Sequence, residues 1–252
     1  MAENSVRPIE SWRIKIFADG ADIDGMLRLS TNPLIKGFTT NPTLMRKAGV
    51  TDYEGFARKV LAALPGWPIS LEVFADDFDA MEAQARTIAG WGANVNVKIP
   101  VTDTQGRSAA PLIARLSAAG IVLNITAILS LDQVRTVAAA LDPRTPAIVS
   151  VFAGRVADTG IDPVPLMSEA LVILRQRPRT ELLWASPREL LNIVQAEAIG
   201  CPIITVTSDL LAKLAFIGKD LSAYSRETVE MFYRDARAAG YVIDTSVVSA
   251  PN

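Results

Sequence analysis

The chain has 252 residues, of which half are hydrophobic, and a formal net charge of −2. This near-neutral balance, with no basic run along the chain, argues against a nucleic-acid partner. The chain contains no histidine, which excludes a Ser-His-Asp or Cys-His catalytic device and a histidine-ligated zinc site of the kind a metal-dependent aldolase would use. We therefore expect no metal.

Short apolar runs alternate with longer amphipathic segments along the whole chain. The runs that predict strands are Arg13–Asp19, Ile35–Asn41, Ile69–Ala75, Asn94–Pro100, Val122–Ile128, Ala147–Ala153, Glu181–Ser186 and Pro202–Thr207. The segments that predict helices between them are Tyr53–Leu64, Asp77–Trp91, Arg107–Ala119, Leu131–Leu141, Pro163–Arg177 and Arg188–Ile199. Eight strands in alternation with helices are typical of an α/β fold of the (β/α)8 TIM-barrel type, and the length suits one such domain.

An open, doubly wound sheet is the alternative fold. It would usually carry a glycine-rich phosphate turn after its first strand, and residues 18–22, Ala-Asp-Gly-Ala-Asp, do not match that pattern. No linker or repeat divides the chain, so we expect residues 1–252 to form a single barrel domain that ends in one more helix at about 224–240. Its predicted apolar stripe is Val229, Phe232, Tyr233 and Ala236.

The single cysteine and the hydropathy pattern indicate the environment of the protein. Cys201 has no second cysteine to pair with, and without a histidine base we expect it to be a buried thiol at the start of a strand. Residues 1–10 are polar and lack the apolar core of a signal peptide. No apolar run reaches the ~18 residues that a membrane span needs. We expect a cytoplasmic enzyme with no membrane partner.

Lys98 occupies an unusual place in the predicted strand Asn94–Pro100. Successive strand side chains point to opposite faces, so Lys98 shares one face with Asn96 while the aliphatic residues share the other. A lysine flanked by aliphatic residues in a central strand is either one half of an ion pair or a nucleophilic amine. Burial favours the neutral form of an amine, which Schiff-base chemistry requires. Strand position alone leaves both interpretations open.

The same alternation brings further side chains into the lumen that Lys98 faces. The residues it turns inward, or permits to face inward at a strand end, are Asp19, Asn41, Glu72, Asn124, Thr126, Ser150 and Phe152. Their outward neighbours are aliphatic, which suits contact with a helix layer. The polar residues fall late in their strands, where TIM-barrel enzymes keep their active sites. So many converging polar groups are costly to bury without a ligand or water, and they indicate an active site.

An amine beside carboxylates, hydroxyls and carboxamides suggests carbonyl chemistry through an imine. In this interpretation Asp19 takes the proton from the hydroxyl on the carbon that is cleaved. Glu72 and Thr126 hold a water that shuttles protons. The amides of Asn41 and Asn124 bind sugar hydroxyls. Two of these residues also have structural interpretations, Asp19 as a helix cap and Asn41 as part of a strand-ending turn.

Five motifs in this sequence resemble, in order and spacing, those of the transaldolase family. They are Phe17-Ala18-Asp19, Thr39-Thr40-Asn41-Pro42, Val97-Lys98-Ile99-Pro100, Asn124-Ile125-Thr126 and Ser150-Val151-Phe152-Ala153-Gly154-Arg155. The resemblance covers residues 13–215 and implies a (β/α)8 barrel transferase of class I aldolase type. It further implies sugar phosphates as substrates, a place in the pentose phosphate pathway, no cofactor, and a homo-oligomer.

The resemblance also implies a role for each site residue. Lys98 would form the Schiff base, Asp19 would act as acid and base, and Glu72 with Thr126 would hold the catalytic water. Asn41 and Asn124 would bind the dihydroxyacetone portion of the donor, and Arg155 and Ser186 would bind the phosphate. Ser150 and Phe152 would also belong to the substrate-binding residues.

The sequence departs from the family at the predicted phosphate site. In the family the serine at position 186 is normally followed by an aromatic residue and then by Arg or Lys, whereas Ser186-Pro187-Arg188 is shorter. Arg188 could reach the same anion from the start of the next helix, or it could be a solvated first-turn residue. An acceptor with a sulfonate, or a sugar without phosphate, is therefore an alternative.

Glu72 and Phe152 distinguish the two chemistries of the family. Fructose-6-phosphate aldolase-like members carry glutamine and tyrosine there, whereas transaldolases proper carry glutamate and phenylalanine, as here. A tyrosine hydroxyl could help to release the bound three-carbon unit, and phenylalanine cannot. We therefore expect transfer of a dihydroxyacetone unit from fructose 6-phosphate or sedoheptulose 7-phosphate to an aldose phosphate, with simple cleavage as the alternative.

A noncatalytic sugar-phosphate-binding barrel is a third interpretation, but it would not need Lys98 beside two proton-handling residues.

Overall fold

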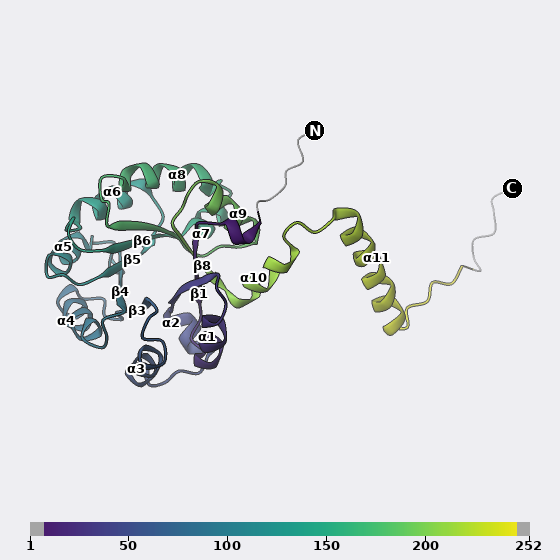
Figure 1. Ribbon diagram of the computed structural model, residues 1–252, viewed down its shortest axis with the longest axis horizontal. Coiled ribbons are helices and arrows are strands. Elements are labelled where there is room, and N and C mark those ends of the chain that lie inside the picture. The colour runs from purple at the N-terminus through teal and green to yellow at the C-terminus, as the bar shows by residue number, and fades with distance from the viewer. Residues whose placement is uncertain (1–7, 246–252) are drawn as a thin grey trace. The chain divides into compact units, whose positions relative to one another are not determined.

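Eight parallel strands close into a barrel in the order of the sequence (Figure 1). The computed structural model describes residues 8–245. The strands are β1 (Lys15–Asp19), β2 (Ile35–Thr39), β3 (Ile69–Glu72), β4 (Val95–Pro100), β5 (Leu123–Ile128), β6 (Ala147–Val151), β7 (Thr180–Trp184) and β8 (Ile203–Thr207). Each lies within its predicted run except β7, which begins one residue earlier. The predicted (β/α)8 barrel is confirmed, and the open sheet is excluded because β1 pairs with β8.

Helices follow the strands and surround them (Figure 1). The predicted ones are α3 (Tyr53–Ala63), α4 (Phe78–Ala89), α5 (Ala110–Ala118), α6 (Leu131–Ala140), α8 (Pro163–Leu174) and α9 (Leu191–Ala198). The sequence did not predict the shorter helices α1 (Ile23–Ser30), α2 (Pro42–Lys47), α7 (Ala153–Asp158) and α10 (Ser208–Ala212), nor the 3-10 turns Ile9–Ser11 and Lys213–Phe216. No helix among residues 8–245 is long and apolar enough to cross a bilayer.

Two helices begin three residues later than predicted because a side chain holds the preceding loop. The Asp103 carboxylate accepts hydrogen bonds from the backbone N–H groups of Gln105 and Arg107, which keeps Arg107 in a turn before α5. The Oδ1 atom of Asn192 accepts the backbone N–H of Arg188 at 2.8 Å and so keeps Arg188 outside α9. Hydrophobic periodicity does not report such local side-chain-to-backbone bonds.

The C-terminal helix α11 (Leu221–Ala238) belongs to a compact unit separate from the barrel, which ends at Leu214. It begins three residues before the predicted position, because the Asp220 side chain accepts the backbone N–H of Ala223 at 2.7 Å and caps the helix. None of its residues is buried, and those of the predicted stripe are exposed or partly exposed. That the whole chain forms one domain stays a prediction.

The register of the central strands sets side chains of different strands at one level. Lys98 is paired through Cα with Glu72 on one side and Asn124 on the other. The aliphatic residues between these positions are fully buried on the outer face of the barrel, as the alternation predicted; they include Leu71, Val97, Ile125, Val149 and Val151. The strands therefore present polar side chains inward at their carboxyl ends and apolar side chains outward to the helices.

An apolar cluster fills the barrel below these polar residues. Phe17 packs with Ile148, Leu183 and Ile203, and it is 2% exposed. The Cα partner of Phe17 on β2 is Gly37, where a Cβ atom would lie 2.7 Å from the Phe17 ring. Because residue 37 has no side chain, the Phe17 ring fits against β2. The packed ring closes the lumen on the side away from the carboxyl ends of the strands.

We expect Gly37→Ala to destabilise the protein by about 1–3 kcal/mol, the usual cost of overpacking a filled core. Gly66→Ala is the matched control, because Gly66 is exposed and a Cβ there meets nothing within 4 Å. Urea denaturation of both variants measures the difference. Equal unfolding midpoints for the two variants would show that the Phe17 ring can move aside and that this packing is not tight.

Candidate active site

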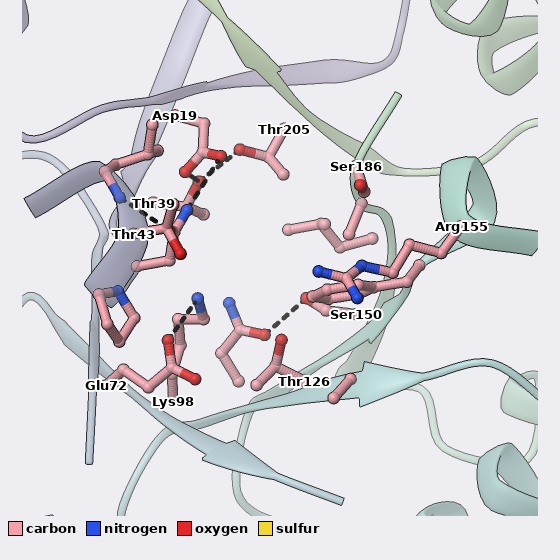
Figure 2. A pocket seen from close by; sticks show the side chains of 18 residues that line it. Asp19, Thr39, Thr43, Glu72, Lys98, Thr126, Ser150, Arg155, Ser186 and Thr205 are labelled. Carbon is pink, nitrogen blue, oxygen red and sulfur yellow. Dashed lines mark hydrogen bonds and ion pairs between the residues drawn. The ribbon is translucent and has the colours of Figure 1, made fainter. Parts of the chain in front are cut away.

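A cavity of about 410 Å³ opens at the carboxyl ends of the strands. Its volume lies within the range of small-molecule binding sites. All the predicted site residues except Arg188 line it. Figure 2 shows polar side chains converging on it from several strands, with Asp19, Thr39 and Thr205 at one side and Ser150, Arg155 and Ser186 at another. Alternation along the strands and, for Arg155 and Ser186, the resemblance to a known family thus pointed to residues that share this cavity.

Lys98 and Glu72 form an ion pair inside the cavity (Figure 2). The Nζ atom of Lys98 lies 3.1 Å from Oε2 of Glu72 and donates to the backbone carbonyl of Thr40 at 2.8 Å. Lys98 is 7% exposed. An ammonium has three N–H donors, so these two contacts hold the amine in place and leave one donor over. Lys98 is thus one half of an ion pair, whose carboxylate is a proton acceptor next to the amine. That the amine is a nucleophile stays a prediction.

Asp19 lies in the same cavity at the end of β1. Its Oδ1 atom accepts a hydrogen bond from the Thr39 hydroxyl at 2.8 Å, and its Oδ2 atom is 3.5 Å from the Asn41 amide nitrogen. Burial raises the pKa of Asp19 above its usual range, although the nearby Lys98 charge opposes this effect. Asp22, and not Asp19, caps α1 through the N–H of Gly25. Asp19 is therefore free of the structural role that the sequence left open.

Asn41 has both of the roles that the sequence suggested. Its Oδ1 atom accepts the backbone N–H of Leu44 at 3.0 Å and so caps α2. The remaining amide group faces Asp19 in the cavity. Because the cap occupies the carbonyl oxygen, the orientation of the amide is fixed, and the N–H donors point toward the cavity.

The Asn124 side chain is hydrogen-bonded to two serine hydroxyls. The Ser150 hydroxyl donates to Oδ1 of Asn124 at 2.6 Å, and the Asn124 amide donates to Oγ of Ser70 at 3.0 Å. All three side chains are buried. Thr126, on the same strand as Asn124, is buried and lines the cavity. The sequence did not single out Ser70, although it faces inward by the same alternation as Glu72.

Arg155, Phe152 and Ser186 form the side of the cavity after β6 and β7. The Arg155 guanidinium carbon lies 5.5 Å from the centre of the Phe152 ring, a distance at which a cation is attracted to the ring face. Ser186 has a φ of +61°, and its carbonyl oxygen occupies the space that a Cβ atom at Gly154 would need. Glycine at position 154 therefore lets the turn after β7 pack against α7.

Arg188 lies outside the residues that line this cavity. Its Nε atom donates to Oδ1 of Asp158 at 2.9 Å, and Nη2 lies 2.5 Å from Oδ2 of the same carboxylate. Asp158 is thus the partner of Arg188 in this structure. The prediction that Arg188 contacts a substrate anion remains untested, and an anion would have to compete with this ion pair.

Some residues of the cavity were missed by the sequence interpretation. Thr205 on β8 faces inward, and its hydroxyl is hydrogen-bonded to that of Thr39. Alternation along β8 could have identified Thr205. Ala127 also lines the cavity, with a φ of +62° where the pairing of β5 with β6 becomes irregular; no hydrophobic pattern signals such a bulge. Within residues 8–245, no group of three acidic or thiol side chains is arranged to bind a metal ion.

The family described as transaldolase/fructose-6-phosphate aldolase matches residues 16–249 of this sequence. The chain belongs to this family. A probable transaldolase of Dehalococcoides mccartyi is 35% identical over 80% of this chain and 90% of its own length. A probable transaldolase of Roseiflexus sp. is 37% identical over 76% of this chain and 85% of its own length. The protein is therefore an enzyme, a transferase of the transaldolase-like aldolase type.

Solved structures that resemble this barrel share its fold at low sequence identity. A putative phosphonomutase from Burkholderia cenocepacia covers 85% of this chain and 94% of its own, with a TM-score of 0.55 and 13% identity. A 2,3-dimethylmalate lyase covers 96% of this chain and 89% of its own, with a TM-score of 0.53 and 11% identity. At these identities the likenesses show a shared fold alone.

Proposed function

We propose that this enzyme transfers a dihydroxyacetone unit from a ketose phosphate, such as fructose 6-phosphate or sedoheptulose 7-phosphate, to an aldose phosphate through a Schiff base on Lys98. The observation that carries the proposal is the place of the Lys98 amine, buried in the cavity with a carboxylate oxygen 3.1 Å away. An amine must lose a proton before it attacks a carbonyl, and Glu72 lies where it can accept that proton.

The Lys98 amine attacks the ketone carbonyl, and loss of water from the adduct gives a protonated imine. Glu72 and Thr126 hold the water that carries protons in this step and in the final hydrolysis. Thr126 supplies a hydroxyl on the side of Lys98 opposite Glu72, since β4 lies between β3 and β5. The two residues thus flank the amine, which suits a water bound between them.

Asp19 removes the proton from the substrate hydroxyl when the carbon–carbon bond breaks. The electrons of that bond move into the protonated imine and form an enamine, and the first aldehyde leaves. The enamine then attacks the acceptor aldehyde, and Asp19 returns the proton to the new hydroxyl. The pKa of Asp19 is raised, mainly by burial, which suits a group that must both take and give a proton.

Glu72 and Phe152 favour transfer over release of free dihydroxyacetone. Phe152 packs against the apolar cluster below the cavity and carries no hydroxyl that could protonate the enamine. The enamine therefore persists until an acceptor aldehyde arrives. Cleavage of the fructose-6-phosphate aldolase type would need a proton donor at this position.

Arg155 is the main cation for the substrate anion, together with the hydroxyl of Ser186. Arg155 can form charge-assisted, bidentate bonds to a phosphate. Arg188 contributes a second cation only where an anion draws it away from Asp158. A single free guanidinium at the anion site also leaves sulfonated or uncharged acceptors as alternatives.

Among the tests of the proposed function, the first concerns the nucleophile. Borohydride with a ketose phosphate should trap a covalent adduct on Lys98, and Lys98→Ala and Lys98→Arg should both abolish trapping and turnover, because a guanidinium stays protonated and forms no imine. Lys36→Ala, a substitution of an exposed lysine on β2, is the control and should be trapped normally. Peptide mapping that located the adduct on another lysine would overturn the assignment.

The second prediction separates transfer from cleavage. With fructose 6-phosphate alone, the wild type should release little dihydroxyacetone, and an aldose phosphate should raise the rate. A well-placed general acid contributes about 10²- to 10⁴-fold, so Phe152→Tyr should raise free release at least several-fold. Phe74→Tyr, a hydroxyl added to a half-exposed ring away from the cavity lining, should not. Wild-type release as fast as transfer contradicts the transaldolase assignment.

The third prediction concerns the anion site. Charge-assisted hydrogen bonds contribute about 1.5–3 kcal/mol each, so Arg155→Ala should raise KM for phosphorylated substrates roughly 10- to 150-fold. The rise should be smaller for sugars without phosphate. Arg188→Ala should have the weaker effect, because Asp158 holds its guanidinium. The phosphate assignment fails if the wild type does not prefer phosphorylated sugars, or if both variants change KM alike for charged and uncharged sugars.

A further inference from the structure

Three lumen side chains from β1, β2 and β8 form a continuous hydrogen-bonded chain. The Thr39 hydroxyl donates to Oδ1 of Asp19 at 2.8 Å, and the hydroxyls of Thr39 and Thr205 are themselves hydrogen-bonded. Figure 2 shows the three side chains in line at one side of the cavity, away from Lys98 and Glu72. Thr39 is 3% exposed and Thr205 is 7% exposed, so bulk water competes little for these bonds.

The donor and acceptor of each bond follow from counting protons. A threonine hydroxyl has a single proton, and the proton of Thr39 goes to Asp19. While Asp19 is ionised, Thr205 is therefore the donor and Thr39 the acceptor in the bond between the two hydroxyls. The chain runs from Thr205 through Thr39 to the Asp19 carboxylate, with every proton directed toward the negative charge.

We propose that Thr205 is a positioning residue, whose hydroxyl orients the Thr39 hydroxyl toward Asp19 and thereby keeps the Asp19 carboxylate ready to take the substrate proton. The role rests on the proposed function of Asp19. Thr205 acts through Thr39, because its own hydroxyl is bonded to that of Thr39 and not to the carboxylate.

The opposite direction of the chain is less favourable. If Asp19 carried a proton on Oδ1, Thr39 would have to accept it and would turn its own proton to Thr205. The proton of Thr205 would then need another acceptor, and the hydrogen bonds of the described residues provide none for it. A chain of donors that ends on a carboxylate strengthens bond by bond in a buried site. Thr205 therefore favours the ionised form of Asp19.

Other groups around Asp19 also shift its pKa. Burial raises the pKa of Asp19 most; the Lys98 charge from β4 and the bonds from Thr39 and Asn41 lower it, and the Glu72 charge from β3 raises it. Loss of the Thr205 hydroxyl weakens the donor at Thr39 and leaves the charged neighbours unchanged. The pKa of Asp19 must then rise, and the base form must be lost at a higher pH than in the wild type.

Thr205→Val tests the proposal, because valine has nearly the same shape and no hydroxyl. One neutral hydrogen bond contributes about 0.5–1.5 kcal/mol, so the acid limb of the kcat profile should move up by roughly 0.5–1 pH unit. Below that limb the variant should lose about 3- to 10-fold in kcat, and well above it kcat should match the wild type. Thr205→Ser, which restores a hydroxyl, should restore the wild-type profile.

Thr145→Val is the matched control, because Thr145 is a buried threonine away from the cavity lining whose hydroxyl donates to the Ser117 carbonyl at 2.8 Å. It should lower stability without moving the acid limb. An unmoved limb in Thr205→Val, a loss of kcat equal at every pH, a rise in KM alone, or a shift of the limb in Thr145→Val overturns the proposal. Borohydride trapping separates the two hypotheses: absence of trapping in the wild type refutes the Schiff base, whereas trapping with an unmoved limb refutes only the role of Thr205.

Discussion

The ion pair between Lys98 and Glu72 is the interaction on which the lumen of this barrel depends. Both side chains are largely buried, and a charge in such a place is tolerated only with a partner and further hydrogen bonds. The register of β3 with β4 provides the partner, because the two residues face each other through Cα. The Thr40 carbonyl provides the additional bond. A shift of either strand by one residue would turn one charge into the helix layer and leave the other unpaired.

The apolar cluster below the ion pair explains why the polar groups gather at one end of the barrel. Phe17 packs in the lumen with Ile148, Leu183 and Ile203, and its Cα partner on β2 is Gly37, which leaves room for the ring. Above it the strands end, and the side chains there meet the open cavity instead of another packed layer. The proposed active site therefore lies where a substrate can enter, at the carboxyl ends of the strands.

Side-chain alternation predicted most of this arrangement, because a strand repeats every two residues and a barrel has only one interior. Once Lys98 was placed inward, the sequence determined the facing of Glu72 and Asn124. Contacts that depend on closure of the barrel were not predictable: Thr39 and Thr205 are 166 residues apart and meet only because β8 returns to β1. The pairing of Arg188 with Asp158 likewise depends on the path of a loop, which periodicity does not describe.

The charged side chains of the cavity lie on two different sides of the barrel opening. Its carboxylates, Asp19 and Glu72, and the Lys98 amine come from β1, β3 and β4, whereas Arg155 comes from α7 on the far side of the barrel opening. Under the proposed function, a substrate with an anionic end would place that end at Arg155 and its uncharged carbonyl beside the Lys98 amine. Gly154 and the positive φ of Ser186 maintain this separation, because they let the turn after β7 pack closely against α7. Under the proposed function, this separation would orient the reacting carbon toward Lys98 while the anion is bound at Arg155.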